Sequence, residues 1–327
     1  MRRVSSISAC VFALFLLNHA SSFAQGYATR PIRLIVPFPP GGTIDMVGRI
    51  VAQKLGERVG QNVVVDNRAG AGGVIGVETV VRAAPDGYTL CLCSSGTLIT
   101  SPMLLAKPPY DARRDFAPVT TIASVPYLLL VRPGGGINSV KDLVALAKQK
   151  PGTLNYGSAG SGSTSHLAAA MFAWVAGIDV VHVPYKGSAP AATELMAGQL
   201  QFVFEAIGAA TQYAKSGRLR ALGISTLKRS VSLPEIPTIS EAGAPGYQMS
   251  TWHSVCAPAG TPPAIVAKLN REIVSGINEP DGRSRLAALG TELYTGTPEE
   301  LRELITQELP RWQKLLAQMR IVADAPR

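Results

Sequence analysis

The feature that most constrains the fold is a repeated alternation between short apolar runs and longer segments with helical periodicity. Strand-like runs occur at residues 32–38, 63–66, 88–93, 127–132, 154–156, 180–183, 202–204, 219–224 and 249–256. The first helical segment places apolar residues every three or four positions from Ile44 to Val59, with Thr43 as its expected cap. Strands that alternate with helices imply parallel sheets, which bind ligands outside the carboxyl ends of their strands. We therefore expect an α/β fold with ligand-binding loops at those ends.

The chain is long enough for two compact lobes. Its 327 residues are 46% hydrophobic and 16% charged, a composition typical of globular proteins. Residues 1–24 have the features of an export signal, because Arg2 and Arg3 precede an apolar run at 7–17 and small residues follow up to Ala24. No later stretch reaches the roughly 18 uninterrupted apolar residues of a membrane span. The sequence therefore predicts an exported protein whose signal peptide is cleaved near Ala24.

The charge of the mature chain favours anionic small molecules over nucleic acids. Removing Arg2 and Arg3 with the signal lowers the formal net charge from +9 by two, to +7. Lys and Arg residues do not form a dense run with interleaved aromatic residues, so the footprint of a nucleic-acid-binding protein is missing. Three cysteines remain after the signal is removed, and we expect Cys91, Cys93 and Cys256 to be small buried apolar residues.

The stretch 157–166, Gly-Ser-Ala-Gly-Ser-Gly-Ser-Thr-Ser-His, is the first candidate site. It lies between the strand-like run at 154–156 and a helical segment with Leu167, Met171 and Trp174 on its expected buried side. A helix that begins near Ser163 leaves its first backbone N–H groups unpaired, so a carboxylate or phosphate could accept them alongside the Ser and Thr hydroxyls. The alternative is an ordinary Gly/Ser loop whose serine caps the helix.

Similar loops follow other strands and favour the first interpretation. Polar or glycine-rich loops stand at residues 38–43, 94–97, 157–165, 184–188 and 205–208. The first two belong to the opening lobe and the other three to the middle lobe. Because ligands bind at the carboxyl ends of parallel strands, these loops predict a cleft lined from both lobes.

Catalytic, cofactor and metal sites fit the sequence less well. The glycine-rich stretch at 70–76 lacks the dinucleotide pattern, because the third glycine should stand at Ile75. No Gly-x-Ser-x-Gly elbow occurs, and the four histidines lack metal-ligand spacing. His166 could activate Ser163 or Ser165 in a hydrolase, but a serine and a histidine within one helical turn seldom align as nucleophile and base. We therefore expect no enzyme activity, no cofactor and no metal.

The sequence resembles the substrate-binding proteins of tripartite tricarboxylate transporters, also called Bug receptors. The resemblance spans nearly the whole mature chain and rests on segments 31–45, 65–73, 84–90, 156–163, 183–187 and 257–262. The first of these reads Pro-Ile-Arg-Leu-Ile-Val-Pro-Phe-Pro-Pro-Gly-Gly-Thr-Ile-Asp. The resemblance implies a type II periplasmic-binding-protein fold, in which two α/β lobes with parallel-rich sheets are joined by crossing strands. We expect lobe 1 at 25–125 and 250–327, and lobe 2 at 126–249.

The resemblance also implies a periplasmic receptor that closes on a small organic acid. The ligand classes left open are dicarboxylates, tricarboxylates, amino acids and aromatic acids. The expected partners are the membrane subunits of a transporter or, as the alternative, a membrane histidine kinase for which the protein is the ligand sensor. The protein itself is expected to be a monomer.

The family's ligand contacts carry over to this chain by position. In the family, one ligand carboxylate lies between a loop and a helix start, which here match Pro40, Gly41, Gly42, Thr43, Ser158, Ser161, Gly162, Ser163, Thr164 and Ser165. Further contacts from lobe 1 are expected from Ser95 and Thr97, and the far wall is expected from Tyr185, Lys186 and Gly187.

Two positions depart from the family pattern. Many relatives carry aspartate where Glu205 stands, and the longer acid is expected to narrow the pocket or change which distal ligand group it accepts. His253 follows Trp252 where an apolar aromatic residue is usual. Both departures bear on which ligand is bound.

Overall fold

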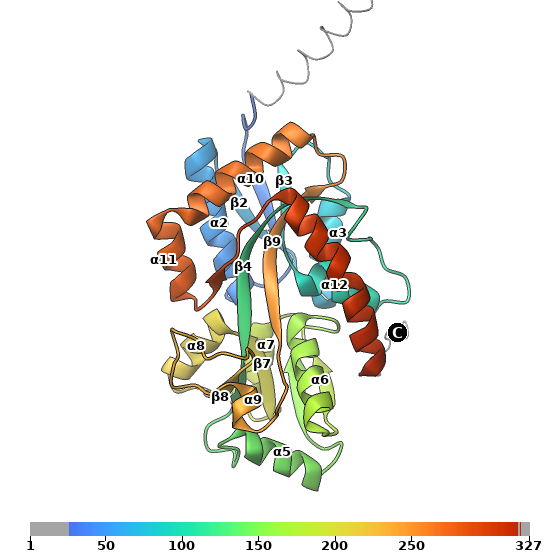
Figure 1. The fold of residues 1–327 in the computed structure, drawn as a ribbon, viewed down its shortest axis with the longest axis vertical. Helices are drawn as coiled ribbons and strands as arrows, with labels where there is room; N and C mark the ends of the chain where they lie inside the picture. Colours follow the sequence, from blue (N-terminus) through green and yellow to red (C-terminus); the bar gives the residue numbers. More distant parts are fainter. Residues whose placement is uncertain (1–25, 320, 322–327) are drawn as a thin grey trace, which may run out of the picture.

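The computed structural model describes residues 26–319 and 321, so the predicted signal peptide and its cleavage site near Ala24 lie outside the described residues. The chain forms two lobes stacked along the long axis of the molecule (Figure 1). One continuous sheet runs through both lobes, with the strand order β2-β1-β3-β9-β4-β7-β5-β6. Strands β8 and β10 pair with β4 beside this path.

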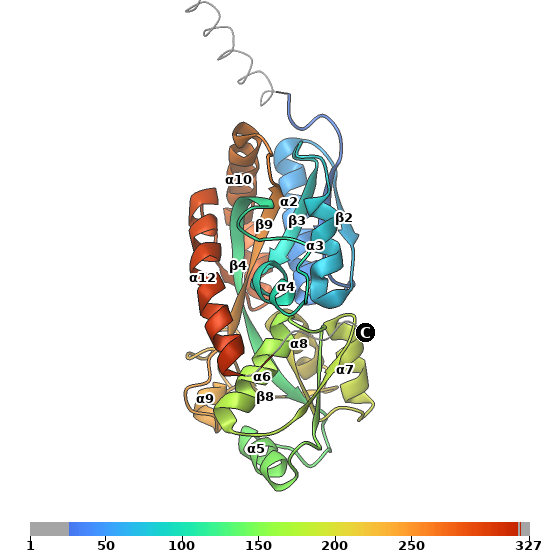
Figure 2. The ribbon, with the colours of Figure 1, turned by 90° about the vertical axis from the view of Figure 1, so that its right-hand side faces the viewer.

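The first lobe contains the N-terminal strands and the C-terminal helices. Strand β1 pairs in parallel with both β2 and β3. The elements of this lobe before the crossing are β1 (Ile32–Val36), α2 (Thr43–Val59), β2 (Val63–Asn67), η1 (Ala71–Gly73), α3 (Val74–Val81), β3 (Thr89–Ser94), η2 (Gly96–Thr100) and α4 (Ser101–Met103). The elements after it are α10 (Pro263–Asn278), α11 (Pro280–Ala288), β10 (Glu292–Leu293) and α12 (Pro298–Gln318). Helix α12 runs along the side of the molecule beside β4 (Figure 2).

The second lobe repeats the alternation of strands and helices. Strand β5 lies between β6 and β7 and is parallel to both. The elements are α5 (Val140–Gln149), β5 (Asn155–Ser158), α6 (Thr164–Ala176), β6 (Val181–Pro184), α7 (Ser188–Met196), β7 (Phe202–Ala206), α8 (Ile207–Lys215), β8 (Arg220–Ile224) and α9 (Ile239–Ala242).

Two antiparallel strands cross between the lobes. They are β4 (Phe116–Val131) and β9 (Ser250–Pro258). Residues 116–126 of β4 pair with β9, and residues 127–131 pair with β7 and β8. The sequence predicted a strand only at 127–132, so the part of β4 before Tyr127 was not predicted. The strand tolerates Pro118 because the register with β9 shifts directly after it.

Local cap signals set several helix starts. Ser163 caps α6 and accepts a hydrogen bond from the backbone N–H of His166, as predicted. Thr297 and Glu300 form a capping box at the start of α12. The predicted cap of α2 is wrong, because Gly42 is the N-cap and Thr43 is the first helical residue. The Thr43 hydroxyl instead bonds to the second lobe.

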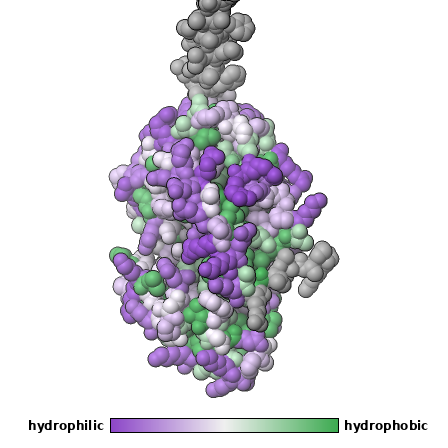
Figure 3. Space-filling model, turned by 45° about the vertical axis from the view of Figure 1, so that its right-hand side comes forward, coloured by the Kyte–Doolittle hydropathy of each residue, from purple (hydrophilic) through white to green (hydrophobic). Residues whose placement is uncertain are grey.

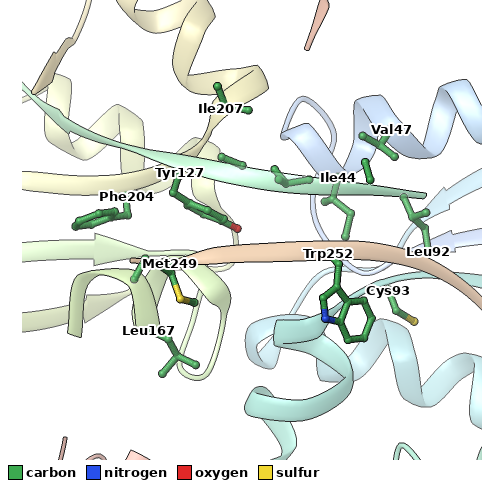
Figure 4. Packing of buried hydrophobic residues seen from close by; sticks show 14 of the residues in the cluster. Ile44, Val47, Leu92, Cys93, Tyr127, Leu167, Phe204, Ile207, Met249 and Trp252 are labelled. Carbon is green, nitrogen blue, oxygen red and sulfur yellow. The ribbon is translucent and has the colours of Figure 1, made fainter. Parts of the chain in front are cut away.

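The core continues through the crossing strands. Figure 4 shows Cys93, Leu92 and Val47 on the side of the first lobe, with Tyr127 and Phe204 on the side of the second. The cysteines Cys91, Cys93 and Cys256 are buried free thiols on β3 and β9, which confirms the prediction.

The surface carries mixed polar and apolar residues. On the face shown in Figure 3, hydrophobic residues lie among hydrophilic ones across both lobes. Trp174 is 50% exposed, so the prediction that it faces the core is wrong, whereas Leu167 and Met171 are buried. No helix among residues 26–319 is long and apolar enough to cross a membrane.

Candidate ligand-binding site

A partly open cavity lies where loops from both lobes meet the crossing strands. Its volume is about 50 Å³, which admits several water-sized groups, since one water needs roughly 10–15 Å³ on the same measure. It is lined by Phe38, Pro39, Gly42, Thr43, Ile44, Ser94, Tyr127, Ala159, Ser163, Thr164, Ser165, Ser188, Ala189, Glu205, Ala206 and His253. No described residue of this lining is a lysine or an arginine.

Four helices direct their N-termini at this cavity. Helix α2 contributes residues 42–43, α6 contributes 163–165, α7 contributes 188–189, and α8 contributes its N-cap Ala206. One of these helices belongs to the first lobe and three to the second. Each N-terminus carries roughly half a positive elementary charge from the aligned peptide dipoles. The cavity therefore favours an anion without any cationic side chain.

Side-chain hydroxyls shape the start of α6. The Ser163 hydroxyl donates to the carbonyl of Gly160 at 2.6 Å and lies 3.1 Å from the Ser165 hydroxyl. The Ser165 hydroxyl accepts from the backbone N–H of Ala159 at 2.9 Å. These bonds fix the loop before α6, so its backbone is organised before a ligand arrives.

A buried aspartate holds the opposite loop, at residues 38–43. Asp45 accepts hydrogen bonds from the backbone N–H of Gly41 at 3.1 Å and from the Asn67 amide at 2.9 Å. Burial opposes its ionisation, but the bonds from Arg49, Asn67 and Gly41 hold the pKa of Asp45 below its ordinary value. Asn67 also donates to the carbonyl of Phe38, which ties the loop to the end of β2.

Glu205 is the acid of the cavity. Its side chain is 3% exposed, accepts a bond from the backbone N–H of Ala206 at 3.0 Å and is bonded to the Ser188 side chain. Burial raises the pKa of Glu205 to about 7, and the bonds from Ser188 and Ala206 only partly offset it. This carboxyl group is therefore partly protonated at neutral pH.

The crossing strands supply two further polar side chains. The Tyr127 hydroxyl is bonded to the Thr164 side chain, and burial raises the pKa of Tyr127. His253 is 2% exposed, and burial lowers its pKa to about 3, so the ring is neutral. Its Nδ1 atom has no hydrogen-bond partner among the described residues. A buried polar atom without a partner is uncommon and points to a bound water or ligand group.

The two lobes touch each other around the cavity. The Thr43 hydroxyl donates to the carbonyl of Ala206 at 3.2 Å and accepts from the backbone N–H of Ala209 at 3.0 Å. On the other side, the Thr100 hydroxyl donates to the carbonyl of Gly162 at 2.7 Å. The structure is therefore a closed form, in which both lobes cover the cavity.

Glycines allow the lobes to approach so closely. A Cβ atom on Gly96 would stand 2.6 Å from the Thr164 Oγ1 atom, and a Cβ atom on Gly187 would stand 2.6 Å from the Cδ atom of Pro39. Both distances are well below ordinary van der Waals contact, so a larger residue at either position would hold the lobes apart.

The structure brings together some of the residues predicted from the sequence. Those that line the cavity are Gly42, Thr43, Ser163, Thr164, Ser165 and Glu205. Ser95 and Thr97 lie outside the lining, because their hydroxyls are bonded to Thr251 and to Ser94 within the first lobe. Pro40 and Gly41 lie between the lining residues Pro39 and Gly42 and are exposed.

The remaining predicted residues lie around the inter-lobe contact. The Ser158 hydroxyl is 2.6 Å from the Nε2 atom of His182, away from the lining. Gly162 is buried against Ser101, and Gly187 is buried against Pro39. A second, more open depression at the inter-lobe seam includes Ser161, Tyr185 and Lys186 among its lining residues.

Sequence reasoning did not name several lining residues as ligand contacts, and four of them bear on the proposed function. Tyr127 was expected only as part of a strand and His253 was noted only as a departure, whereas Ser188 and Ala206 lie in the predicted loops 184–188 and 205–208 but were not named as ligand contacts. The position of Ser188 directly after the expected wall residues was the one local signal that could have found it.

The arrangement does not resemble the hydrolase that the sequence left open. The Nδ1 atom of His166 accepts the backbone N–H of Gly162 at 3.1 Å, and burial lowers the pKa of His166 to about 3. His166 therefore supports the loop and is not placed as a base for Ser163 or Ser165. Among the described residues, no group of three or more His, Cys, Asp or Glu side chains could hold a metal ion.

Comparisons with known proteins agree with this geometry. The family model described as "Tripartite tricarboxylate transporter family receptor" matches residues 47–321. Protein BugT of Bordetella pertussis is 39% identical over 290 residues, which are 88% of this chain and 89% of BugT.

Solved structures give the same result. The structure of Rpa4515 of R. palustris with adipate has a TM-score of 0.88 and 37% identity, and covers 90% of this chain and 99% of that one. MatC of Rhodopseudomonas palustris with bound malate has a TM-score of 0.84 and 32% identity, and covers 89% of this chain and 100% of that one. These likenesses confirm the expected two-lobed periplasmic-binding fold. The chain belongs to the tripartite tricarboxylate transporter receptor family.

Proposed function

We propose that the protein is a periplasmic receptor that captures a small organic carboxylate and delivers it to the membrane subunits of a tripartite tricarboxylate-type transporter. The observation that carries this proposal is the convergence of four helix N-termini on one inter-lobe cavity whose described lining has no cationic side chain. Adipate and malate, the ligands of Rpa4515 and MatC, are both dicarboxylates, which makes dicarboxylates the first class to test.

The α6 N-terminus is the proposed carboxylate anchor. Residues 163–165 bring three hydroxyl side chains to the cavity, together with the backbone N–H groups of Thr164 and Ser165, since the N–H of Ser163 donates to the carbonyl of Gly160. Gly42 and Thr43 face them from α2. Each hydrogen bond to a charged group contributes about 1.5 to 3 kcal/mol net. Three or four such bonds suffice for micromolar affinity, which corresponds to about 8 kcal/mol after ordering costs.

Closure follows from where the donors lie. We place lobe 1 at residues 25–125 and 250–327 and lobe 2 at 126–249, so that α2 and α6 approach the ligand from opposite sides. An open form offers one half of the donors, whereas the closed form surrounds the carboxylate with both. A ligand that gains contacts only in the closed form shifts the population toward it. The transporter can then distinguish the loaded receptor by its closed shape.

The unpartnered Nδ1 atom of His253 supports an occupied cavity. We infer that a water or a ligand oxygen satisfies this atom in the complex, because an unpaired buried polar atom is costly.

Receptor action also requires export, and we propose that cleavage after Ala24 releases the mature chain as a monomer. Mass spectrometry of the protein purified from periplasm tests the cleavage site.

Binding without turnover is the decisive property. Thermal-shift screening of the mature protein against dicarboxylates, tricarboxylates, amino acids and aromatic acids should give a raised melting temperature with a narrow set of acids. Calorimetry then gives the affinity, and mass spectrometry of the mixture should recover the acid unchanged. A screen in which no acid raises the melting temperature would count against a carboxylate receptor, and conversion of the acid would indicate an enzyme.

A further inference from the structure

Glu205 places a carboxyl group in a cavity that is built to hold an anion. It lies on β7 directly before the N-terminus of α8 and beside Ser188, which opens α7. Its carboxyl group is bonded to the backbone N–H of Ala206 and to the Ser188 side chain. No described residue of the lining offers a cation that could neutralise a second negative charge. An ionised Glu205 would therefore repel the ligand.

We propose that Glu205 keeps its proton in the complex and donates a hydrogen bond to the second carboxylate of a dicarboxylate ligand. This inference rests on the proposed function, and it adds the ligand class and the residue that selects it. A protonated carboxyl group offers one O–H donor, whereas an ionised one only accepts. Two carboxyl groups in close contact share one proton, because both cannot ionise together. The bound pair therefore consists of a neutral Glu205 and an ionised ligand carboxylate.

The surroundings of Glu205 support the neutral form. Burial, partly offset by the bonds from Ser188 and Ala206, brings the pKa of this group to about 7 without a ligand, and an adjacent ligand carboxylate raises it further. The titratable side chains on the elements that pack against β7 are Tyr127, Tyr156, His166, Glu194, Tyr213 and Lys215.

Two of these groups face Glu205. Its charge raises the pKa values of Tyr127 and Tyr213 in addition to the effect of burial, so both phenols are neutral. His253 on β9 lines the same cavity, and burial keeps both His253 and His166 neutral with pKa values of about 3. None of these four groups titrates near neutral pH. A change of affinity in that range therefore reports on Glu205.

The helix N-termini argue against an amino group at the same place. An ammonium group beside Glu205 would lie close to the partial positive charges at the starts of α7 and α8. A carboxylate meets favourable dipoles there, provided that Glu205 is protonated. The cavity is therefore selective for a ligand with an acidic group at both ends.

Calorimetry across a pH series tests the inference on the wild-type protein. Adipate and malate are the probes, and both of their carboxyl groups are ionised over this range. Because only the protonated protein binds, the affinity should fall about 30-fold between about pH 6 and about pH 8.5. Titrations in buffers of different ionisation enthalpy should show that nearly one proton is taken up at the upper pH and almost none at the lower one.

The Glu205→Gln variant removes the titration and keeps an N–H donor in the same place. Its affinity for the same acid should match the wild type at low pH within a few-fold and stay flat as the pH rises. The control is Glu235→Gln, because Glu235 is exposed on the surface, and this variant should follow the wild-type profile. As a ligand control, 6-aminohexanoate has the chain length of adipate with one ammonium end, and it should bind at least tenfold more weakly.

The outcomes separate the two proposals. A dicarboxylate that binds the wild type without proton uptake, or an amino acid that binds more tightly as the pH rises, would overturn the role of Glu205 and leave the receptor function intact. If none of the screened acids binds at any pH, the receptor function itself fails, and the role of Glu205 fails with it.

Discussion

Replacing Gly96 with alanine should block the closed form without harming the fold. Gly96 opens η2 in the first lobe and faces the start of α6 in the second. An added Cβ atom would stand 2.6 Å from Oγ1 and 3.0 Å from the backbone nitrogen of Thr164, where ordinary contact is 3.4–4 Å. The backbone of Gly96 is helical, so alanine introduces no strain there and favours the helix. The two shortest contacts exist only when the lobes meet, and the third, 3.3 Å to the Ser94 Oγ atom, lies within the first lobe.

The size of the effect follows from the cost of overpacking. Extra atoms in a packed interface cost about 1 to 3 kcal/mol. Because this cost falls on the closed form alone, the affinity for the bound acid should fall about 5- to 150-fold. The free energy of unfolding of the ligand-free protein should change by less than about 1 kcal/mol.

Calorimetry and small-angle scattering check this result. The dissociation constant of the Gly96→Ala variant is compared with that of Gly26→Ala, since a Cβ atom at Gly26 meets nothing within 4 Å. Gly187→Ala is a second, independent wedge variant, meaning a substitution whose added Cβ atom keeps the lobes apart. The backbone of Gly187 is extended, so alanine fits it without strain, and the added Cβ atom would contact the Pro39 ring. With saturating ligand, both wedge variants should keep a larger radius of gyration than the wild type. Wild-type affinity in both variants would refute the idea that binding requires the contacts seen here.

Three further predictions concern stability and the thiols. Burial raises the pKa of Glu205 from 4.5 to about 7. Between these pH values the folded protein keeps a proton on Glu205 that the unfolded chain has lost, so the stability of the fold decreases as the pH rises across this range. Between about pH 4.5 and pH 7, the unfolding free energy of the wild type should fall by on the order of 3 kcal/mol relative to that of Glu205→Gln. If urea titrations show the same difference in unfolding free energy between the two proteins at both ends of this pH range, the prediction is wrong. Thr297→Ala removes the cap of α12 and should cost about 0.5 to 2 kcal/mol in the same assay with no change in ligand affinity. The buried thiols Cys91, Cys93 and Cys256 should react with a thiol reagent only after unfolding, and rapid reaction of the native protein would show that β3 and β9 open locally.

Local signals in the sequence predicted the parts of the fold that depend on neighbouring residues. The start of α6 at Ser163 and that of α12 at Thr297 follow from a capping side chain and the backbone N–H three residues later. The alternation of strands and helices predicted the α/β architecture for the same reason, because periodicity is a local property.

Features set by distant contacts were harder to predict. Phe116–Pro118 look like a loop, yet they pair with the far end of β9 and extend β4. Thr43 looks like a cap, yet its hydroxyl bonds to Ala206 and Ala209, more than 160 positions away. No local pattern encodes such partners, so tertiary structure overrides the propensity of the segment.

The candidate site shows the same division. Residues 163–165 were found because glycines and hydroxyls before a helix are a local signal of anion binding. Ser95 and Thr97 carry the same signal, but η2 turns the Thr97 hydroxyl toward Ser94 and leaves it outside the lining. Tyr127 and His253 line the cavity because β4 and β9 pass between the lobes next to it. This arrangement depends on the pairing of two strands that are far apart in the sequence.

A crystal structure of the mature protein with the acid identified by thermal shift tests the central claim most directly. The account predicts one carboxylate within hydrogen-bond distance of the backbone N–H groups of Thr164 and Ser165, with Gly42 and Thr43 facing it from the other lobe. An acid bound outside this cavity, or inside it with its carboxylates turned away from the start of α6, would contradict the account.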